Sequence, residues 1–198
     1  MKRNLSFVKD VGCFKLKIVV LRLSHRYVRD DRVTSHLFLA ARAFGAHGVI
    51  YTGQRDRKVE ATIQEITEAW GGRFDVTYKM KAADVMKEWK KRGGDLIHLS
   101  MYGLPLQNMV EAIRTSPADK LIVVGGAKVP KFVYDEADWN VAVTSQPHSE
   151  ISALSIFLHE FFEGRELSQS FEDAELIVVP QARGKKIVRK SGRESGVS

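Results

Sequence analysis

Short apolar runs alternate with amphipathic segments about six times along this chain, and this alternation is the strongest constraint on its fold. The apolar runs are rich in Val, Ile and Leu and predict buried strands over 17–23, 47–52, 74–78, 96–101, 121–124 and 140–143. Apolar residues at helical spacing predict helices over 33–44, 56–70, 82–92, 106–114 and 150–163, with a helical turn over 133–137. This order favours an α/β fold in which helices cover both faces of a parallel sheet.

The pattern changes after Gly164. Two β-branched runs, 175–179 and 186–189, flank a turn rich in Pro and Gly and predict a β-hairpin. A two-stranded hairpin is only marginally stable alone, so we expect it to pack on the main sheet or on another subunit. The predicted divisions are an N-terminal extension (1–16), a main domain (17–164) and a hairpin with its tail (165–198).

The composition narrows the class of protein. The chain has 198 residues, of which 44% are hydrophobic and 28% charged, the balance of a globular domain with a real core. No apolar run approaches the ~20 residues that cross a bilayer, and charged residues interrupt the N-terminal segment. We therefore expect neither a membrane span nor a signal peptide. The single cysteine, Cys13, cannot form an internal disulfide, which fits a cytoplasmic location.

Positive charge gathers in two places, in a chain whose net charge is +7. The loop before the first helix and the C-terminal hairpin hold these clusters, which include Arg22, Arg26, Arg29, Arg32, Lys185 and Lys186. Two separate basic clusters are complementary in charge to the phosphates of a nucleic-acid backbone. For the loop before the first helix, here called the arginine loop, the alternative is a solvated surface turn. Arg32 directly precedes the expected helix. A guanidinium there opposes the helix dipole unless it shares an anion, which favours a bound phosphate.

Two of the expected strands stop abruptly in small and polar residues. Val124 leads into Gly125 and Gly126, and Val143 leads into the segment TSQPHSE. The carboxyl ends of parallel strands meet at one edge, where glycine allows close backbone approach, so these loops favour one shared ligand pocket. The alternative is a polar loop that supplies a helix N-cap at Ser149.

Several common site motifs are absent from the sequence. It has no phosphate-binding GxxxxGK[ST], no GxGxxG after the first strand and no GxSxG. The six histidines lack ligand spacing, so we expect no metal site. His98 lies in a buried strand pattern and is interpreted as a satisfied core histidine. His148 lies in the polar loop and is expected near a ligand.

Five segments in one register carry a family resemblance. They are LRLSHRYVRDDRVTSHLFLAARAFGAHGVIY (21–51), HLSMYGL (98–104), IVVGGAKVP (122–130), NVAVTSQPHSEISAL (140–154) and VVPQARGKK (178–186). Together they resemble the archaeal tRNA (cytidine(56)-2′-O)-methyltransferases, which belong to the SPOUT class. The similarity runs from about Lys17 to Lys190, so residues 1–16 are additional.

The resemblance implies a fold that periodicity alone does not predict. SPOUT proteins have a parallel sheet with a C-terminal trefoil knot, act as homodimers and bind S-adenosylmethionine within the knot without a metal. Threaded chains are rare, so strand order by itself favours an open sheet. Carried over by position, the implied cofactor contacts are Leu104, Gly125, Gly126, Ala127, Lys128, Val129, Val143, Thr144, Ser145, Gln146, Pro147, His148, Ser149 and Glu150.

The implied activity is methylation of the ribose 2′-hydroxyl of cytidine 56 in tRNA. In related 2′-O-methylating enzymes an arginine near the first helix removes the proton, but Leu39 stands at that place here. We expect Arg32, with Arg22 as second choice, to take this role. The tRNA phosphates are expected to contact Arg26, Arg29, Lys185 and Lys186.

Two other functions stay open at this point. One is a catalytically inactive tRNA-binding protein with the same fold, and the other is a dinucleotide-dependent oxidoreductase, which the missing glycine fingerprint disfavours. The sequence also leaves open which residue takes the proton, how the dimer is oriented, whether fully folded tRNA is required and whether residues 1–16 belong to the native protein.

Overall fold

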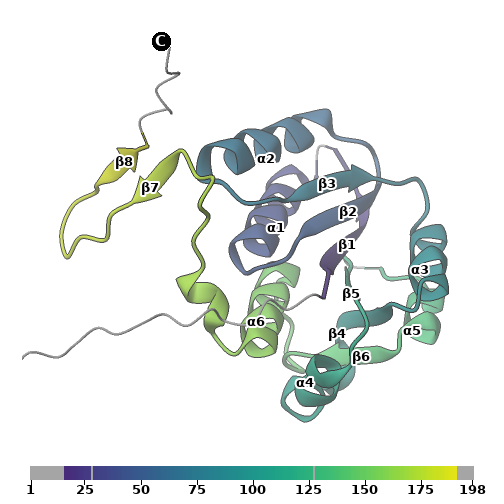
Figure 1. Cartoon of the computed structure of the whole chain (residues 1–198). Coiled ribbons are helices and arrows are strands. Elements are labelled where there is room, and N and C mark those ends of the chain that lie inside the picture. The colour runs from purple at the N-terminus through teal and green to yellow at the C-terminus, as the bar shows by residue number, and fades with distance from the viewer. Residues whose placement is uncertain (1–15, 28, 127, 191–198) are drawn as a thin grey trace, which may run out of the picture.

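A wholly parallel, six-stranded sheet lies at the centre of the molecule (Figure 1). The computed structural model describes residues 16–27, 29–126 and 128–190. The strands are β1 (Ile18–His25), β2 (Gly48–Gly53), β3 (Asp75–Tyr78), β4 (Asp95–Pro105), β5 (Lys120–Val124) and β6 (Trp139–Ala142). Their order across the sheet is β3-β2-β1-β5-β4-β6, which confirms the predicted parallel sheet.

Helices cover both faces of the sheet, as predicted (Figure 1). They are α1 (Asp31–Ala43), α2 (Arg57–Trp70), α3 (Ala82–Lys91), α4 (Leu106–Thr115), α5 (Lys131–Glu136) and α6 (Glu150–Phe162). The larger hydrophobic cluster lies under α1, α2, α4 and α6 and includes Phe38 and Phe157. The smaller one, with Val85 and Val133, lies under α3 and α5. Within the described ranges, no helix is both long enough and apolar enough to span a membrane.

The helix that follows the QPHSE segment begins at a polar cap. The Ser149 side chain accepts a hydrogen bond from the Ile151 backbone N–H at 3.1 Å, which satisfies one of the free donors of the first turn of α6. Apolar residues then face the sheet along the whole helix, and Leu154 and Leu158 are fully buried. The cap and the buried face together place Glu150 at the carboxyl edge of the sheet.

The end of β4 differs from the prediction. The predicted strand ends at residue 101, but β4 continues as an extended strand to Pro105. Val141 of β6 pairs with Leu99 and again with Leu104, and a strand residue has one pairing position on each edge. The pairing of β4 with β6 therefore breaks over residues 100–103, where the register shifts. An ideal Cβ built on Gly103 would lie 2.4 Å from the Asn140 carbonyl carbon and oxygen, so only glycine fits this passage.

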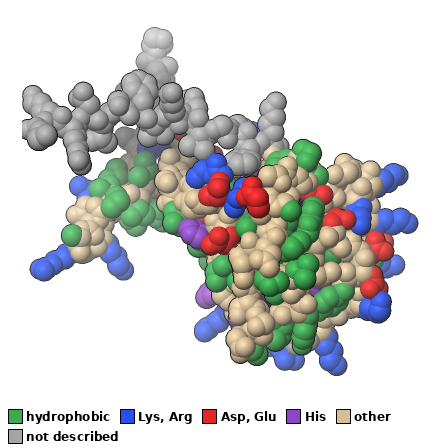
Figure 2. Space-filling model, turned by 90° about the horizontal axis from the view of Figure 1, so that it is seen from below, with side chains coloured by type: hydrophobic (Ala, Val, Ile, Leu, Met, Phe, Trp, Pro, Cys, Tyr) green, Lys and Arg blue, Asp and Glu red, His purple; other side chains and the backbone are tan. Residues whose placement is uncertain are grey.

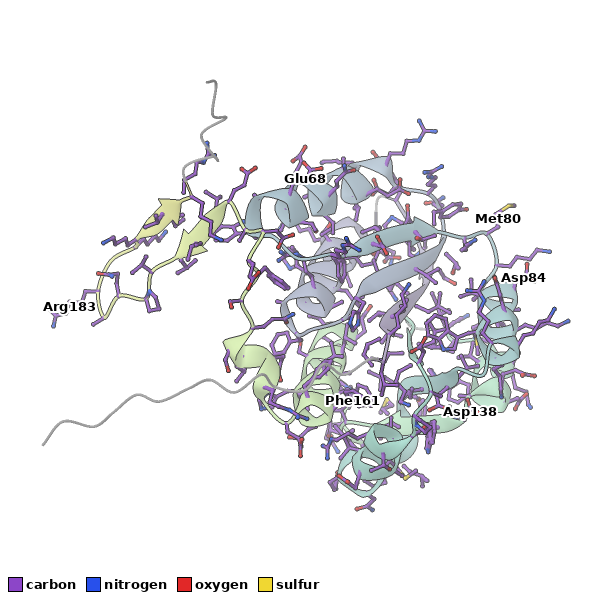
Figure 3. The ribbon with its side chains drawn as sticks, in the orientation of Figure 1. Glu68, Met80, Asp84, Asp138, Phe161 and Arg183 are labelled. Carbon is purple, nitrogen blue, oxygen red and sulfur yellow. The ribbon has the colours of Figure 1, made fainter. Side chains whose placement is uncertain are left out.

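The C-terminal hairpin forms a second, separate sheet. Its strands β7 (Leu176–Val178) and β8 (Ile187–Arg189) are antiparallel, which matches the predicted hairpin. It projects away from the main body, with Arg183 near its tip (Figures 1 and 3). Neither described hairpin strand pairs with the main sheet, so whether the hairpin packs there or on another subunit stays a prediction. The Glu175 backbone N–H instead donates to the carbonyl of Ala69 in α2 at 3.1 Å.

Candidate active site

A large cavity opens at the carboxyl edge of the parallel sheet. Its volume is about 1200 Å³, enough for a nucleoside-sized ligand with further room beside it. The ends of β1, β4 and β5 wall it, together with the loops that follow β5 and β6. The arginine loop and the loop after β5 with Gly125 and Gly126, here called the glycine loop, thus line the same cavity, as expected for two loops at the same edge of a sheet.

Arg22 is the most deeply buried cation on the cavity wall. Its side chain is 3% exposed, and Nη2 lies 3.1 Å from Glu150 Oε1 at the start of α6. Among the described residues, Nε and Nη1 have no hydrogen-bond partner. Burial lowers the pKa of Arg22, whereas the carboxylates of Glu150 and Asp30 oppose this shift. Two buried guanidinium donors beside a cavity indicate a site for an oxygen atom or an anion.

The arginine loop is held by Asp30. Arg26 Nε and Nη2 donate to the two Asp30 oxygens at 3.1 and 3.2 Å, and the Arg26 backbone N–H donates to Oδ2 at 3.1 Å. The Arg26 guanidinium holds the pKa of Asp30 below its usual value. Arg26 and Arg29 both line the cavity, while Arg32 is exposed on the first turn of α1 and does not. This loop presents positive charge at the mouth of the cavity.

The glycine loop after β5 brings the backbone to the cavity. A Cβ on Gly125 would lie 2.4 Å from Val129 Cγ2, so a larger residue requires the Val129 side chain to move. A Cβ on Gly126 would meet nothing closer than Arg22 Nη1 at 3.7 Å, which places this backbone next to the buried guanidinium. Both glycines, Lys128 and Val129 line the cavity, whereas Ala127 lies outside the described residues.

Pro147 and His148 of the loop after β6 line the same cavity, as does Glu150 at the start of α6. His148 Nδ1 lies 2.6 Å from the Gln146 carbonyl oxygen, so Nδ1 is the donor and the ring is oriented by its own loop. Within the described ranges, no group of three or more His, Cys, Asp or Glu is placed to hold a metal ion.

Comparison with known proteins identifies the family. The family model described as "tRNA ribose 2'-O-methyltransferase, aTrm56" matches residues 70–188. The tRNA (cytidine(56)-2′-O)-methyltransferase of Methanothermobacter thermautotrophicus is 51% identical over 170 residues, which are 86% of this chain and 95% of that protein. This chain belongs to the tRNA (cytidine(56)-2′-O)-methyltransferase family. Another member, from Staphylothermus marinus, is 48% identical over 183 residues, 92% of this chain and 98% of its own.

Solved structures place this tRNA (cytidine(56)-2′-O)-methyltransferase family member among SpoU-type folds. The A. aeolicus TrmH/SpoU tRNA modifying enzyme superposes with a TM-score of 0.58 at 17% identity, over 76% of each chain. The SpoU methyltransferase AviRb of Streptomyces viridochromogenes, solved with AdoMet, gives 0.54 at 17% identity over 77% of this chain and 58% of its own. At such low identity the likeness concerns the fold alone, and it confirms the expected SPOUT-class sheet.

The cavity of this family member contains part of the predicted set. Ten of the predicted site residues line it: Arg22, Arg26, Arg29, Gly125, Gly126, Lys128, Val129, Pro147, His148 and Glu150. The described positions that do not line it are Arg32, Leu104, Val143, Thr144, Ser145, Gln146 and Ser149. Lys185 and Lys186 lie on the exposed hairpin. The roles of all these residues stay predictions.

Sequence reasoning missed further residues of the wall, among them three on β4 and α5. His98, Ser100 and Tyr134 line the cavity, although His98 was interpreted as a satisfied core residue. Its position near the carboxyl end of a predicted strand was the available signal, because ligands bind at that edge. Tyr134 comes from the short helix α5, and its closeness to β4 is a tertiary contact that no local pattern carries.

Proposed function

We propose that this chain catalyses the S-adenosylmethionine-dependent methylation of the ribose 2′-hydroxyl of cytidine 56 in tRNA, in the cytoplasm. The observation that carries the proposal is the single cavity in which the glycine loop and the buried Arg22 guanidinium face each other. The printed names of the relatives supply the substrate, because the chain is about half identical to them over nearly their whole length.

The glycine loop suits the adenosyl cofactor. Gly126 is exposed and leaves its backbone uncovered, so peptide groups of this loop are available to a nucleoside. Pro147 and His148 line the cavity from the loop after β6. When bound, S-adenosylmethionine supplies an electrophilic sulfonium methyl group to the 2′-oxygen and leaves as a neutral thioether.

We infer that the chain passes through a trefoil knot at this site. The double pairing of Val141 with Leu99 and Leu104, and the tight passage at Gly103, support this inference because they carry β4 around β6. Such a passage holds the ends of β4 and β6 together at the cavity.

Arg22 and Glu150 are proposed to handle the proton. The 2′-oxygen must lose its proton as its bond to the methyl carbon forms. Arg22 Nη1, which has no partner among the described residues, contacts this oxygen and stabilises its developing negative charge. Glu150, 3.1 Å from Nη2, carries the carboxylate that takes the proton. Alignment of the nucleophile with the methyl group lowers the barrier by several kcal/mol more.

The tRNA phosphates are proposed to contact the exposed cations around the mouth of the cavity. Arg26 is oriented toward the cavity by the two-pronged contact with Asp30, which lowers the entropy lost on binding. Arg29 and Arg32 extend this positive surface, and Lys185 and Lys186 on the hairpin form the second cluster.

A methyl-transfer assay tests the proposal. An unmodified tRNA transcript with cytidine at position 56 is expected to accept tritiated methyl groups, and mass spectrometry of the digested product should find 2′-O-methylcytidine at that position. The matched control carries 2′-deoxycytidine at position 56, which lacks the nucleophile and should accept no label.

Other outcomes of this assay favour the alternative functions. S-adenosylhomocysteine should raise the melting temperature of the protein, and NAD should not, because only a true ligand stabilises the folded state. Absence of label despite stabilisation by S-adenosylhomocysteine would favour an inactive tRNA-binding protein. Stabilisation by NAD alone would favour an oxidoreductase.

We propose further that the active form is a homodimer to which the hairpin contributes. Four apolar residues, Ile177, Val178, Ile187 and Val188, are exposed on the hairpin. Figure 2 shows hydrophobic side chains on this projection next to Lys and Arg. An exposed apolar surface on a marginally stable hairpin favours a protein partner, here a second copy of the chain.

Charge placed on this surface is expected to separate the subunits. The double substitution Val178→Asp, Ile187→Asp should weaken the dimer about 100-fold, measured as molar mass by light scattering after gel filtration. Met80→Asp is the matched control, because Met80 is exposed on the opposite side of the molecule from Arg183 (Figure 3). If the double variant dimerises as tightly as Met80→Asp, the proposed role of the hairpin in the dimer is contradicted.

A further inference from the structure

His98 is a fully buried side chain on the wall of the cavity. It lies near the carboxyl edge of the sheet, where β4 pairs with β5 on one side and with β6 on the other. Its Nδ1 lies 2.8 Å from Asn140 Oδ1. Its Nε2 has no hydrogen-bond partner among the described residues, so one ring nitrogen is satisfied and the other is not.

The hydrogen bonds of Asn140 decide which ring nitrogen carries the hydrogen. Asn140 Nδ2 donates to the Tyr134 carbonyl oxygen at 2.9 Å, so Oδ1 is the atom that faces His98. An amide oxygen only accepts, and Nδ1 is therefore the protonated nitrogen. Burial lowers the pKa of His98 and keeps the ring neutral, although the contact with Asn140 opposes the shift. Nε2 is consequently a lone-pair acceptor.

The surroundings of His98 suit a flat heterocycle. The Tyr134 ring packs edge-on against the His98 ring, with 4.5 Å between the ring centroids, and Leu99 and Val129 line the same cavity. These aromatic and apolar groups offer contact area but no donor to Nε2. Tyr134 is only half-buried and lines the cavity beside His98.

His98 lies apart from the proposed reaction centre. Arg22 is two strands away, about 10 Å across the sheet, and continues the face of β1 that packs under α1 and α6. His98 contacts Tyr134 of α5 and therefore lies on the other face. Both residues nevertheless line the same cavity, so a ligand long enough to span it can contact Arg22 at one end and His98 at the other.

We propose that His98 Nε2 accepts a hydrogen bond from the exocyclic amino group of the cofactor's adenine, and thereby selects an adenine over a 6-oxopurine. This inference rests on the proposed function, because it assigns the base end of the same cofactor site. Adenine presents an amino donor on an otherwise flat ring, whereas hypoxanthine presents an oxygen there, which Nε2 repels.

Calorimetric binding of two probes tests the proposal. S-adenosylhomocysteine should bind the unchanged protein about tenfold more tightly than S-inosylhomocysteine, which has a 6-oxo group. In His98→Asn the side-chain amide can still donate to Asn140, but nothing stands in the place of Nε2. In this variant the two probes should bind with nearly equal affinity. His98→Gln, whose amide oxygen reaches the place of Nε2, should restore part of the preference.

The outcomes separate this inference from the proposed function. An equal preference in folded His98→Asn and in the unchanged protein would make His98 a core residue only and overturn the inference. Failure of the unchanged protein to bind either probe would overturn the proposed function instead.

A measurement on the unchanged protein covers the case in which the variants do not fold. The ¹⁵N resonance of His98 Nε2 should move upfield when S-adenosylhomocysteine is added, as a lone pair that accepts a hydrogen bond does. S-inosylhomocysteine should leave it in place. Equal responses to the two probes would contradict the assignment.

Discussion

Replacement of Arg22 by alanine is expected to reduce the rate of methyl transfer by about 10²- to 10⁴-fold, with little change in the affinity for S-adenosylhomocysteine. The reason is geometric, because Arg22 combines deep burial, two donors without a partner among the described residues and a carboxylate 3.1 Å away. Single-turnover assays of methyl transfer, with cofactor affinity measured by calorimetry, check this result. Unchanged turnover in a folded Arg22→Ala protein would contradict the proposed role.

Two further variants separate Arg22 from its neighbours. Glu150→Gln keeps the shape of Glu150 but removes its charge, and should lose nearly as much rate as Arg22→Ala because paired groups act as a unit. Arg32→Ala should weaken tRNA binding while the rate at saturating tRNA stays within about threefold, since an exposed phosphate contact adds affinity rather than chemistry. A larger rate loss in Arg32→Ala than in Arg22→Ala would return Arg32 to the first place that the sequence suggested.

The main elements were predictable because their signals are local. The helix predicted over 56–70 is observed as Arg57–Trp70, since Asp56 accepts hydrogen bonds from the backbone N–H groups of Lys58 and Val59 and a left-handed Gly71 ends it. The buried Arg22 was also visible in principle. It follows Ile18 and Val20 at a spacing of two residues, and the strand period therefore points all three side chains to the same buried face.

The unpredicted features depend on contacts distant in sequence. The apolar pattern of β4 fades after Leu99, and its extension to Pro105 exists only because Leu104 and Pro105 pair with β6. The state of His98 likewise depends on Asn140, 42 residues later, which occupies Nδ1 and leaves Nε2 without a partner among the described residues. No single-residue pattern distinguishes a half-satisfied buried histidine from a fully satisfied one.

The substitution Gly103→Ala is expected to destabilise the fold by about 3 kcal/mol and to lower the melting temperature by about 6 to 12 °C. A Cβ at this position would lie 2.4 Å from the carbonyl carbon and oxygen of Asn140 and 2.5 Å from the backbone nitrogen of Val141. These are backbone atoms held in the β4–β6 pairing, so they cannot turn aside as a flexible side chain would. Thermal unfolding followed by circular dichroism measures the loss.

Gly126→Ala provides the matched control, because a Cβ there meets nothing closer than 3.7 Å. It should leave the melting temperature nearly unchanged, since the site has room for a methyl group. The comparison isolates the close approach of β4 to β6 at Gly103 from the general effect of replacing a glycine. Equal melting temperatures for the two variants would mean that residues 100–103 yield easily, and that β4 does not hold β6 at the cavity. A specific loss in Gly103→Ala, with weaker binding of S-adenosylhomocysteine, would instead tie cofactor binding to this passage.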